Sequence, residues 1–169
     1  MKASSIKAIL TALRARNVRY LVAGGLAVNA YGYLRFTKDA DLAIELVPEN
    51  IHAAFAALAS LGYQPNIPIT AEQFARPENR EKWIRENEMK VLQFWSDQHR
   101  ETPIDILIDV PFDFATESKA APTKELSDVG PVPIVTLPTL VAMKRAANRE
   151  QVRIDLENLR LYYPEEIIY

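Results

Sequence analysis

Hydrophobic residues near the start of the chain recur with a helical period. They follow the i, i+3, i+4, i+7 spacing of one helix face: Ile6, Ile9, Leu10 and Leu13. Ser4 or Ser5 stands where a side chain can cap the first turn. The pattern predicts an amphipathic helix that ends near Asn17 and packs by one apolar stripe.

Four shorter stretches have the length of strands. The apolar run 18–23 stops at Gly24-Gly25, after which residues 26–31 have helical character. Residues 39–46 alternate strictly, so one face of the strand is aliphatic and the other carries Asp39 and Asp41. Residues 90–95 and 103–110 predict two strands of an antiparallel pair, joined by a polar turn. Asp105 falls on the non-aliphatic face of the second.

The remaining segments are mostly helical. Residues 48–62 predict a helix, and residues 63–88 a short helical excursion with a capping-box pattern from Thr70 to Gln73. Residues 112–125 carry only loop signals, and 126–136 contain two short apolar runs. Thr136 caps the first of two final helices within 138–162. We therefore expect a single domain over 1–169 of the α/β (α+β) class, a mixed β-sheet with flanking helices and a helical C-terminal segment.

Composition narrows the function classes. The 169 residues are 49% hydrophobic and 25% charged, as in ordinary globular domains, and the net charge of −2 gives no general field for a nucleic acid backbone. The absence of cysteine excludes disulfides and thiolate chemistry, and the distant His52 and His99 disfavour a histidine zinc site. Lys7 interrupts any signal-peptide core, and no run approaches ~18 apolar residues. A cytoplasmic protein without a membrane segment is expected.

Three aspartates form the candidate catalytic and metal site. Asp39 and Asp41 lie two residues apart on one strand face, with Cα atoms ~6.5–7 Å apart. Asp105 joins them if its strand is a neighbour at ~4.8 Å. Carboxylate oxygens suit Mg²⁺, with Mn²⁺ as an alternative, and such ions serve phosphoryl transfer. The competing interpretation is that the acids are merely a solvated strand face.

Candidate nucleotide-binding residues surround these acids. Gly24 and Gly25 stand between a strand and a helix, where glycine lets a phosphate approach the backbone, although tight turns use the same residues. Polar and cationic side chains that could meet a triphosphate come just before the acidic pair: Arg35, Thr37 and Lys38. A solvated loop is the alternative interpretation of this second group.

Lys144 lies on the core-facing stripe of its helix, and Asp155 lies on the apolar stripe of the next. An unpaired buried charge would cost several kcal/mol, so the two side chains are expected to pair. The pair is either purely structural or a lysine aimed at nucleotide phosphates and held by its partner.

The combined pattern resembles the amino-terminal motif of the nucleotidyltransferases of the DNA-polymerase-β-like superfamily, most closely the minimal, AbiEii-toxin-like branch. The resemblance rests on YLVAGGLAVNAYGYLRFTKDADLAIEL, PIDILIDV and VPIVTLPTLVAMKRAANREQVRIDLENL. It implies a nucleotidyltransferase-like fold, a nucleoside triphosphate held by the glycine turn, and Mg²⁺ on Asp39, Asp41 and Asp105. The implied reaction transfers a nucleoside monophosphate to an acceptor hydroxyl and releases pyrophosphate.

Other functions stay open at the level of sequence. Gly25 is not followed by the serine of many relatives, and Gln151-Val152 replace the Arg-Asp pair usual in the toxin-like branch. A catalytically degenerate binding module with a partner protein, such as a toxin-antitoxin component, is therefore the alternative. A metal-dependent nuclease ranks last because it gives the glycines no role. The acceptor is a protein, a transfer RNA or a small molecule.

Overall fold

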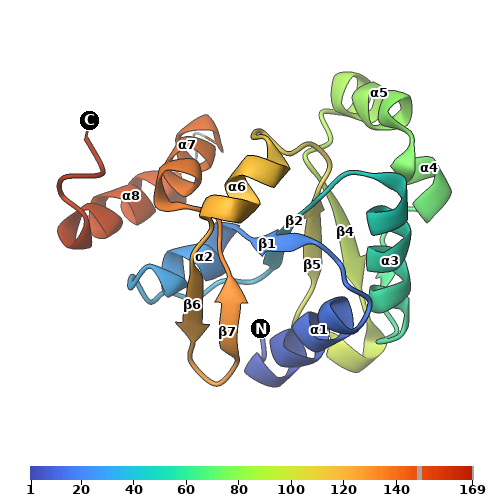
Figure 1. Ribbon diagram of the computed structural model, residues 1–169, viewed down its shortest axis with the longest axis horizontal. Coiled ribbons are helices and arrows are strands. Elements are labelled where there is room, and N and C mark those ends of the chain that lie inside the picture. Colours follow the sequence, from blue (N-terminus) through green and yellow to red (C-terminus); the bar gives the residue numbers. More distant parts are fainter. Residues whose placement is uncertain (148–149, 169) are drawn as a thin grey trace.

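A mixed five-stranded sheet organises the computed structural model, which describes residues 1–147 and 150–168 (Figure 1). The strands are β1 (Tyr20–Val22), β2 (Ala40–Ile44), β3 (Gln64–Pro65), β4 (Val91–Trp95) and β5 (Ile104–Leu107), and a separate two-stranded sheet contains β6 (Thr123–Leu126) and β7 (Gly130–Pro133). The order in the large sheet is β1-β2-β5-β4-β3. Only β2 and β5 pair in parallel within it; the other neighbours, including the predicted β4 and β5, are antiparallel.

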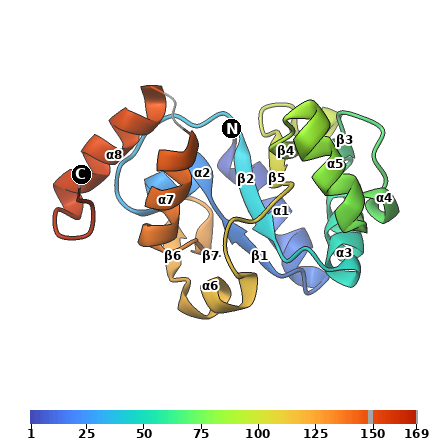
Figure 2. The same cartoon turned by 90° about the horizontal axis from the view of Figure 1, so that it is seen from above.

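Helices flank both sheets. They are α1 (Ala3–Ala15), α2 (Gly24–Ala30), α3 (Pro48–Ala59), α4 (Ala71–Ala75), α5 (Pro77–Asn87), α6 (Phe114–Ala120), α7 (Leu137–Ala147) and α8 (Glu150–Tyr162). Figure 2 shows α7 and α8 on one side of the molecule and α4 and α5 on the other, with β2 and β5 between them. The expected mixed sheet with flanking helices and a helical C-terminal segment is confirmed.

The two faces of the large sheet differ in chemistry, as the alternation predicts. Leu42, Ile106 and Leu92 are in register on β2, β5 and β4, and all three are buried. On the same face, Phe55 of α3 meets Phe94 of β4 edge-on, with ring centroids 5.1 Å apart. This face is the core, so residues of opposite parity on the same strands point away from it.

Two local predictions are wrong, for identifiable reasons. Neither Ser4 nor Ser5 caps α1: Lys2 takes the N-cap position, and Ser5 is buried with its Oγ 2.8 Å from His99 Nδ1. The segment 112–125, predicted as loop, contains α6 and most of β6. The buried Glu117 of α6 accepts hydrogen bonds from the chain at 136 and 139, and such distant polar contacts leave no apolar period to detect.

The other elements follow the predicted pattern closely. The capping box is present, since Thr70 Oγ1 accepts from the backbone of Gln73 and the Gln73 side chain accepts from that of Thr70. The Thr136 hydroxyl accepts from the Thr139 backbone at 3.4 Å as α7 begins. The strand β3 is an addition that the pattern did not indicate. Within the described residues, every helix is too short or too polar to cross a membrane.

Candidate active site

A row of polar side chains crosses the face of the sheet opposite the α3 side. Asp41 of β2 is in register with Asp105 of β5, and Asp105 is in register with Gln93 of β4. All three are half-buried, and Gln93 Nε2 donates to Asp105 Oδ1 at 3.0 Å. Asp39 precedes Asp41 with the same parity. The strand pairing thus brings the three sequence-predicted aspartates to one face.

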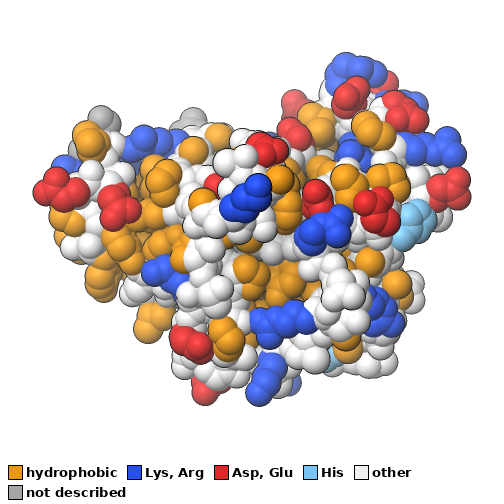
Figure 3. All heavy atoms as spheres, in the orientation of Figure 1, with side chains coloured by type: hydrophobic (Ala, Val, Ile, Leu, Met, Phe, Trp, Pro, Cys, Tyr) orange, Lys and Arg blue, Asp and Glu red, His pale blue; other side chains and the backbone are white. Residues whose placement is uncertain are grey.

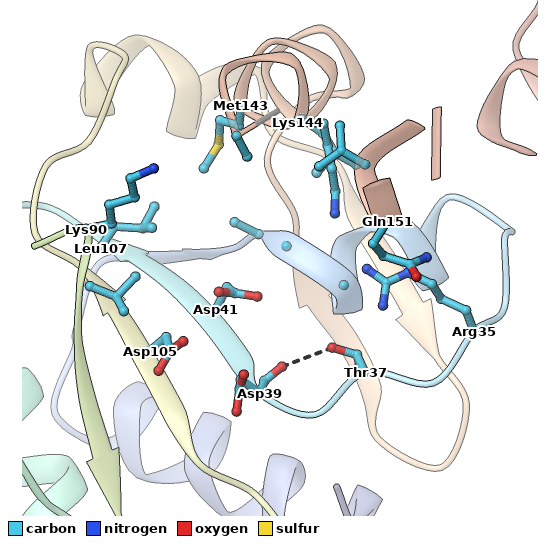
Figure 4. Close-up of a pocket in the computed structure, with 17 residues that line it drawn as sticks. Arg35, Thr37, Asp39, Asp41, Lys90, Asp105, Leu107, Met143, Lys144 and Gln151 are labelled. Atoms are coloured by element: carbon cyan, nitrogen blue, oxygen red, sulfur yellow. Dashed lines mark hydrogen bonds between the residues drawn. The ribbon is translucent and has the colours of Figure 1, made fainter. Parts of the chain in front are cut away.

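These acids line a cavity of about 370 Å³, within the usual size of small-ligand sites (Figure 4). The close-up shows Asp39, Asp41 and Asp105 on one side of the cavity and Lys144 of α7 opposite them. Of the other predicted residues, Gly24, Gly25, Arg35 and Thr37 also line it. Lys38 is exposed and does not; its positive charge reaches the site only through space.

Burial and crowding set the charge of the acids. Loss of water raises the pKa of Asp41 to about 6, with further increases from the charges of Asp105 and Asp39, while Lys144 and a hydrogen bond from the Gly25 backbone oppose the rise. Burial also raises the pKa of Asp105, against the opposing hydrogen bond from Gln93. Both shifts favour the neutral carboxyl group, so a bound cation would relieve the cost of ionising these acids.

The three aspartates have the right chemistry for a divalent cation, but their side chains are not arranged to coordinate one by themselves. Carboxylate oxygens are the ligands that Mg²⁺ prefers, and Asp39 Oδ1 is buried without a hydrogen-bond partner among the described residues. Yet no group of three histidine or acidic side chains in the described chain is arranged to hold a metal ion by itself. Other oxygens, such as those of water or a phosphate, would have to complete the coordination.

The glycine pair makes room for the protein's own side chains. Gly24 has a φ of +59°, and a Cβ there would lie 1.8 Å from Asp41 Oδ2. A Cβ on Gly25 would lie 2.3 Å from Thr37 Oγ1, and that hydroxyl donates to the Asp39 carbonyl at 3.2 Å. Any side chain at Gly24 would displace a candidate metal ligand. The space beside the glycine backbone, which we predicted for a phosphate, is occupied by the side chains of Asp41 and Thr37.

The buried carboxylate of Asp155 holds the two cations that line the cavity, Lys144 and Arg35, which we call the cationic wall. Asp155 is fully buried, and Lys144 Nζ lies 2.6 Å from its Oδ2, which confirms the predicted pair. Arg35 adds a second cation, with Nη2 donating to Oδ2 at 2.9 Å and Nε 2.6 Å from Oδ1, and Gln151 donates to Oδ1 at 3.1 Å. Burial would raise the pKa of Asp155, but these hydrogen bonds outweigh burial and hold the pKa below its usual value.

Sequence reasoning missed three features in or beside this cavity. The Arg35–Asp155 pair joins residues 120 positions apart, which no local pattern reveals. The position of Gln93 could have been predicted, because it lies two residues after the half-buried Val91 and so on the same face of β4. Lys90, the residue before β4, lines the cavity itself, and no periodic signal marks it.

Comparisons with known proteins identify the fold. No family model and no curated protein sequence matches the chain. The solution structure of the antibiotic-resistance factor ANT(2'')-Ia aligns with a TM-score of 0.60 and 16% identity, covering 96% of this chain and 84% of that one. The crystal structure of ANT(2'')-Ia with adenylyl-2''-tobramycin aligns at 0.59 and 18% identity, covering 95% and 86%.

A third solved structure, the lincomycin-bound lincosamide antibiotic adenylyltransferase LnuA, aligns with a TM-score of 0.60 and 13% identity, covering 90% of this chain and 92% of that one. These neighbours belong to the DNA-polymerase-β-like nucleotidyltransferase superfamily. At such low identity the likeness establishes the architecture alone. The chain has a nucleotidyltransferase fold, with its acidic face where β2 and β5 pair and its cations on α7 and on the loop before β2.

Proposed function

We propose that the protein is a nucleotidyltransferase that moves a nucleoside monophosphate from a nucleoside triphosphate to the hydroxyl of an acceptor. The observation that carries this proposal is the parallel register of Asp41 with Asp105, across a cavity from Lys144. Acids on one wall and cations on the other suit a triphosphate, whose oxygens need both metal ions and basic side chains. A solvated strand face would not need cations on the opposite side of a cavity.

Asp105 is the proposed base. The acceptor oxygen forms a bond to the α-phosphorus, the bond between that phosphorus and the oxygen bridging to the β-phosphorus breaks, and pyrophosphate leaves. Asp105 takes the hydroxyl proton, and its raised pKa brings its basicity closer to neutral pH. Gln93 orients the Asp105 carboxylate through the hydrogen bond from its Nε2 to Asp105 Oδ1.

The cationic wall is proposed to receive the phosphates. Lys144 and Arg35 have side chains only 11% and 17% exposed, so they can act on a phosphate without being fully solvated. Gly24, Gly25 and Thr37 line the same cavity and would contact the nucleotide. The exposed Lys90 would do so from the edge of the cavity, and the charge of Lys38 would act through space.

We further propose that Asp39, Asp41 and Asp105 hold Mg²⁺, or Mn²⁺ in its place, together with phosphate oxygens. The support is the raised pKa of Asp41 and the unpartnered Asp39 Oδ1, both of which a cation would relieve. When bound, the ion would neutralise triphosphate charge and polarise the α-phosphate.

The neighbours favour a particular donor and acceptor class. LnuA is named an adenylyltransferase and holds lincomycin, and ANT(2'')-Ia holds adenylyl-2''-tobramycin. We therefore propose adenosine triphosphate as the donor and a small molecule as the acceptor, ahead of a protein or a transfer RNA. Resemblance to the AbiEii-like branch, with a partner protein and a degenerate site, is the second candidate, because Gln151 and Val152 replace its usual Arg-Asp pair.

The test is transfer of label from each α-³²P triphosphate with Mg²⁺ to the separated small-molecule, protein and RNA fractions of a lysate. We expect label from adenosine triphosphate in the small-molecule fraction, lost in Asp105→Asn. Asp109→Asn is the matched control, since Asp109 is exposed on the same segment and outside the cavity. Triphosphate binding without transfer to any fraction would refute the enzyme and support the binding module.

A further inference from the structure

A second cavity lies next to the catalytic one. Its volume is about 610 Å³, and it is walled by the loop 66–69, by α5 and the residues after it, and by β4. Val91 lines both cavities, which makes them neighbours on the same face of the sheet. The segment 63–88, to which the proposed chemistry assigns nothing, supplies most of this wall.

This second cavity, which we call the groove, is lined by uncharged residues although charged residues surround it. None of the described residues that line it carries a formal charge; its apolar members include Ile67, Ile69, Trp83 and Met89, and its polar members are amides. The helix α5 nevertheless reads PENREKWIREN, and Figure 3 shows side chains of both charges over the projection that α5 forms. Trp83 and Asn87, one helical turn apart, are the α5 residues that face the groove.

The aromatic wall is held in place from behind. Trp83 stacks on Phe74, with ring centroids 6.5 Å apart and planes 25° apart, and Phe74 is fully buried in the core. Trp83 itself is only half-buried, so part of its ring is left for a ligand. A fixed indole surface favours a planar or aliphatic ring of a bound molecule.

Gln93 connects this groove to the proposed reacting centre. Its side chain lines the groove, and its Nε2 donates to Asp105 Oδ1. A molecule in the groove therefore ends beside the carboxylate that would take the acceptor's proton. The volume is within the range of small-molecule sites.

We infer that the groove binds the acceptor, and that the acceptor is an uncharged small molecule with an apolar ring next to its reacting hydroxyl. The inference rests on the proposed function for the identity of the occupant. A polycationic acceptor is disfavoured because none of the described residues that line the groove is a carboxylate that could pair with its ammonium groups. Asn66, Asn87 and Gln93 supply amide contacts for hydroxyls along the ring.

Binding is tested without catalysis by fluorescence of Trp83. The chain contains two tryptophans, and Trp95 does not line the groove, so Trp95→Phe leaves Trp83 as the sole reporter. The probes are phenyl β-D-glucopyranoside, methyl β-D-glucopyranoside, which lacks the ring, and tobramycin. We expect the phenyl glucoside to perturb Trp83 with an affinity at least about tenfold above that of the other two. Equal responses, a stronger response to tobramycin, or no response to any probe would overturn the inference.

Two charge-introducing variants locate the bound probe. Ile67 lines the groove and is 42% exposed, while Ile84 of α5 is 36% exposed and lies outside the groove. Ile67→Arg should weaken the phenyl glucoside about tenfold or more, and Ile84→Arg should leave its affinity unchanged. The same response in both variants would contradict binding at this site.

The two proposals fail in different ways. Perturbation of Trp83 by the phenyl glucoside, without any nucleotide transfer, would keep the groove and reject the enzyme. Transfer to a lysate compound whose KM is insensitive to Ile67→Arg would keep the enzyme and reject the groove. The thermal shift produced by adenosine triphosphate and Mg²⁺ should be the same in Ile67→Arg, Ile84→Arg and the unaltered protein, because neither residue lines the nucleotide cavity.

Discussion

Asp41→Asn should make the ligand-free protein more stable. The carboxylate of Asp41 is half-buried beside Asp105 and Asp39, and these surroundings raise its pKa to about 6 from 3.8. An amide of the same shape removes the charge and still accepts the hydrogen bond that the Gly25 backbone donates. The variant therefore removes the cost of burying the charge, together with its repulsion by Asp105 and Asp39, without opening a cavity.

The magnitude follows from the displaced pKa. A difference of about two units between the folded and unfolded states corresponds to roughly 3 kcal/mol lost once the group ionises. Burying the new amide costs ~1 kcal/mol, which leaves a net gain of ~2 kcal/mol. For a domain of this size, that gain raises Tm by ~4–8 °C.

The pH dependence gives the prediction its sign. The Asp41 pKa is higher in the folded state, so between about pH 4 and about pH 6 the folded protein binds more protons than the unfolded one, and stability falls as pH rises. The difference between variant and unaltered protein should open across this window and stay constant above it. Both forms are melted in EDTA at a series of pH values. A variant that is less stable at about pH 8, or a difference independent of pH, would refute the reasoning.

Two further predictions concern the glycine pair and the cationic wall. Gly24→Ala should lower Tm and abolish the thermal shift with adenosine triphosphate and Mg²⁺, whereas Gly130→Ala, also at positive φ but with nothing within 4 Å of its Cβ, should lower Tm only and retain the shift. Lys144→Met should cost only ~1–2 kcal/mol by urea unfolding because Arg35 still pairs with Asp155, whereas Asp155→Leu strands two cations and should cost ~3–5 kcal/mol. Equal losses would show that Arg35 does not share the carboxylate, and unchanged nucleotide affinity in Lys144→Met would remove the lysine from the proposed site.

The periodicity of the sequence predicted which face of a strand or helix each charged side chain occupies. The two-residue alternation placed Asp41 and Asp105 on the polar faces of their strands, and the helical period placed Lys144 and Asp155 on inward stripes. In each case, an apolar neighbour of known parity reveals where the charged side chain points. The same logic correctly bounded α8 at Glu150–Tyr162.

Contacts between distant segments were not predictable in this way. The alternation shows that β2 and β5 are strands, but their parallel pairing is a property of the whole sheet. Arg35 sits in a loop, and nothing around it indicates a carboxylate in the last helix. The helix α6 was missed because its buried residue is Glu117, which is stabilised by hydrogen bonds rather than by an apolar stripe.

Asp155 holds the cationic side chains of the cavity away from its acids. Lys144 is close enough to lower the pKa of Asp41. Without another partner, its ammonium group would be attracted across the cavity to that carboxylate. Instead its Nζ is held 2.6 Å from Asp155, and Arg35 is held by the same carboxylate. The acids on the sheet are thereby left without ion-pair partners among the described residues, and the cavity between the walls stays open. The proposed ligand, a triphosphate with its metal ions, would pair its cations with the acids and its phosphates with Lys144 and Arg35.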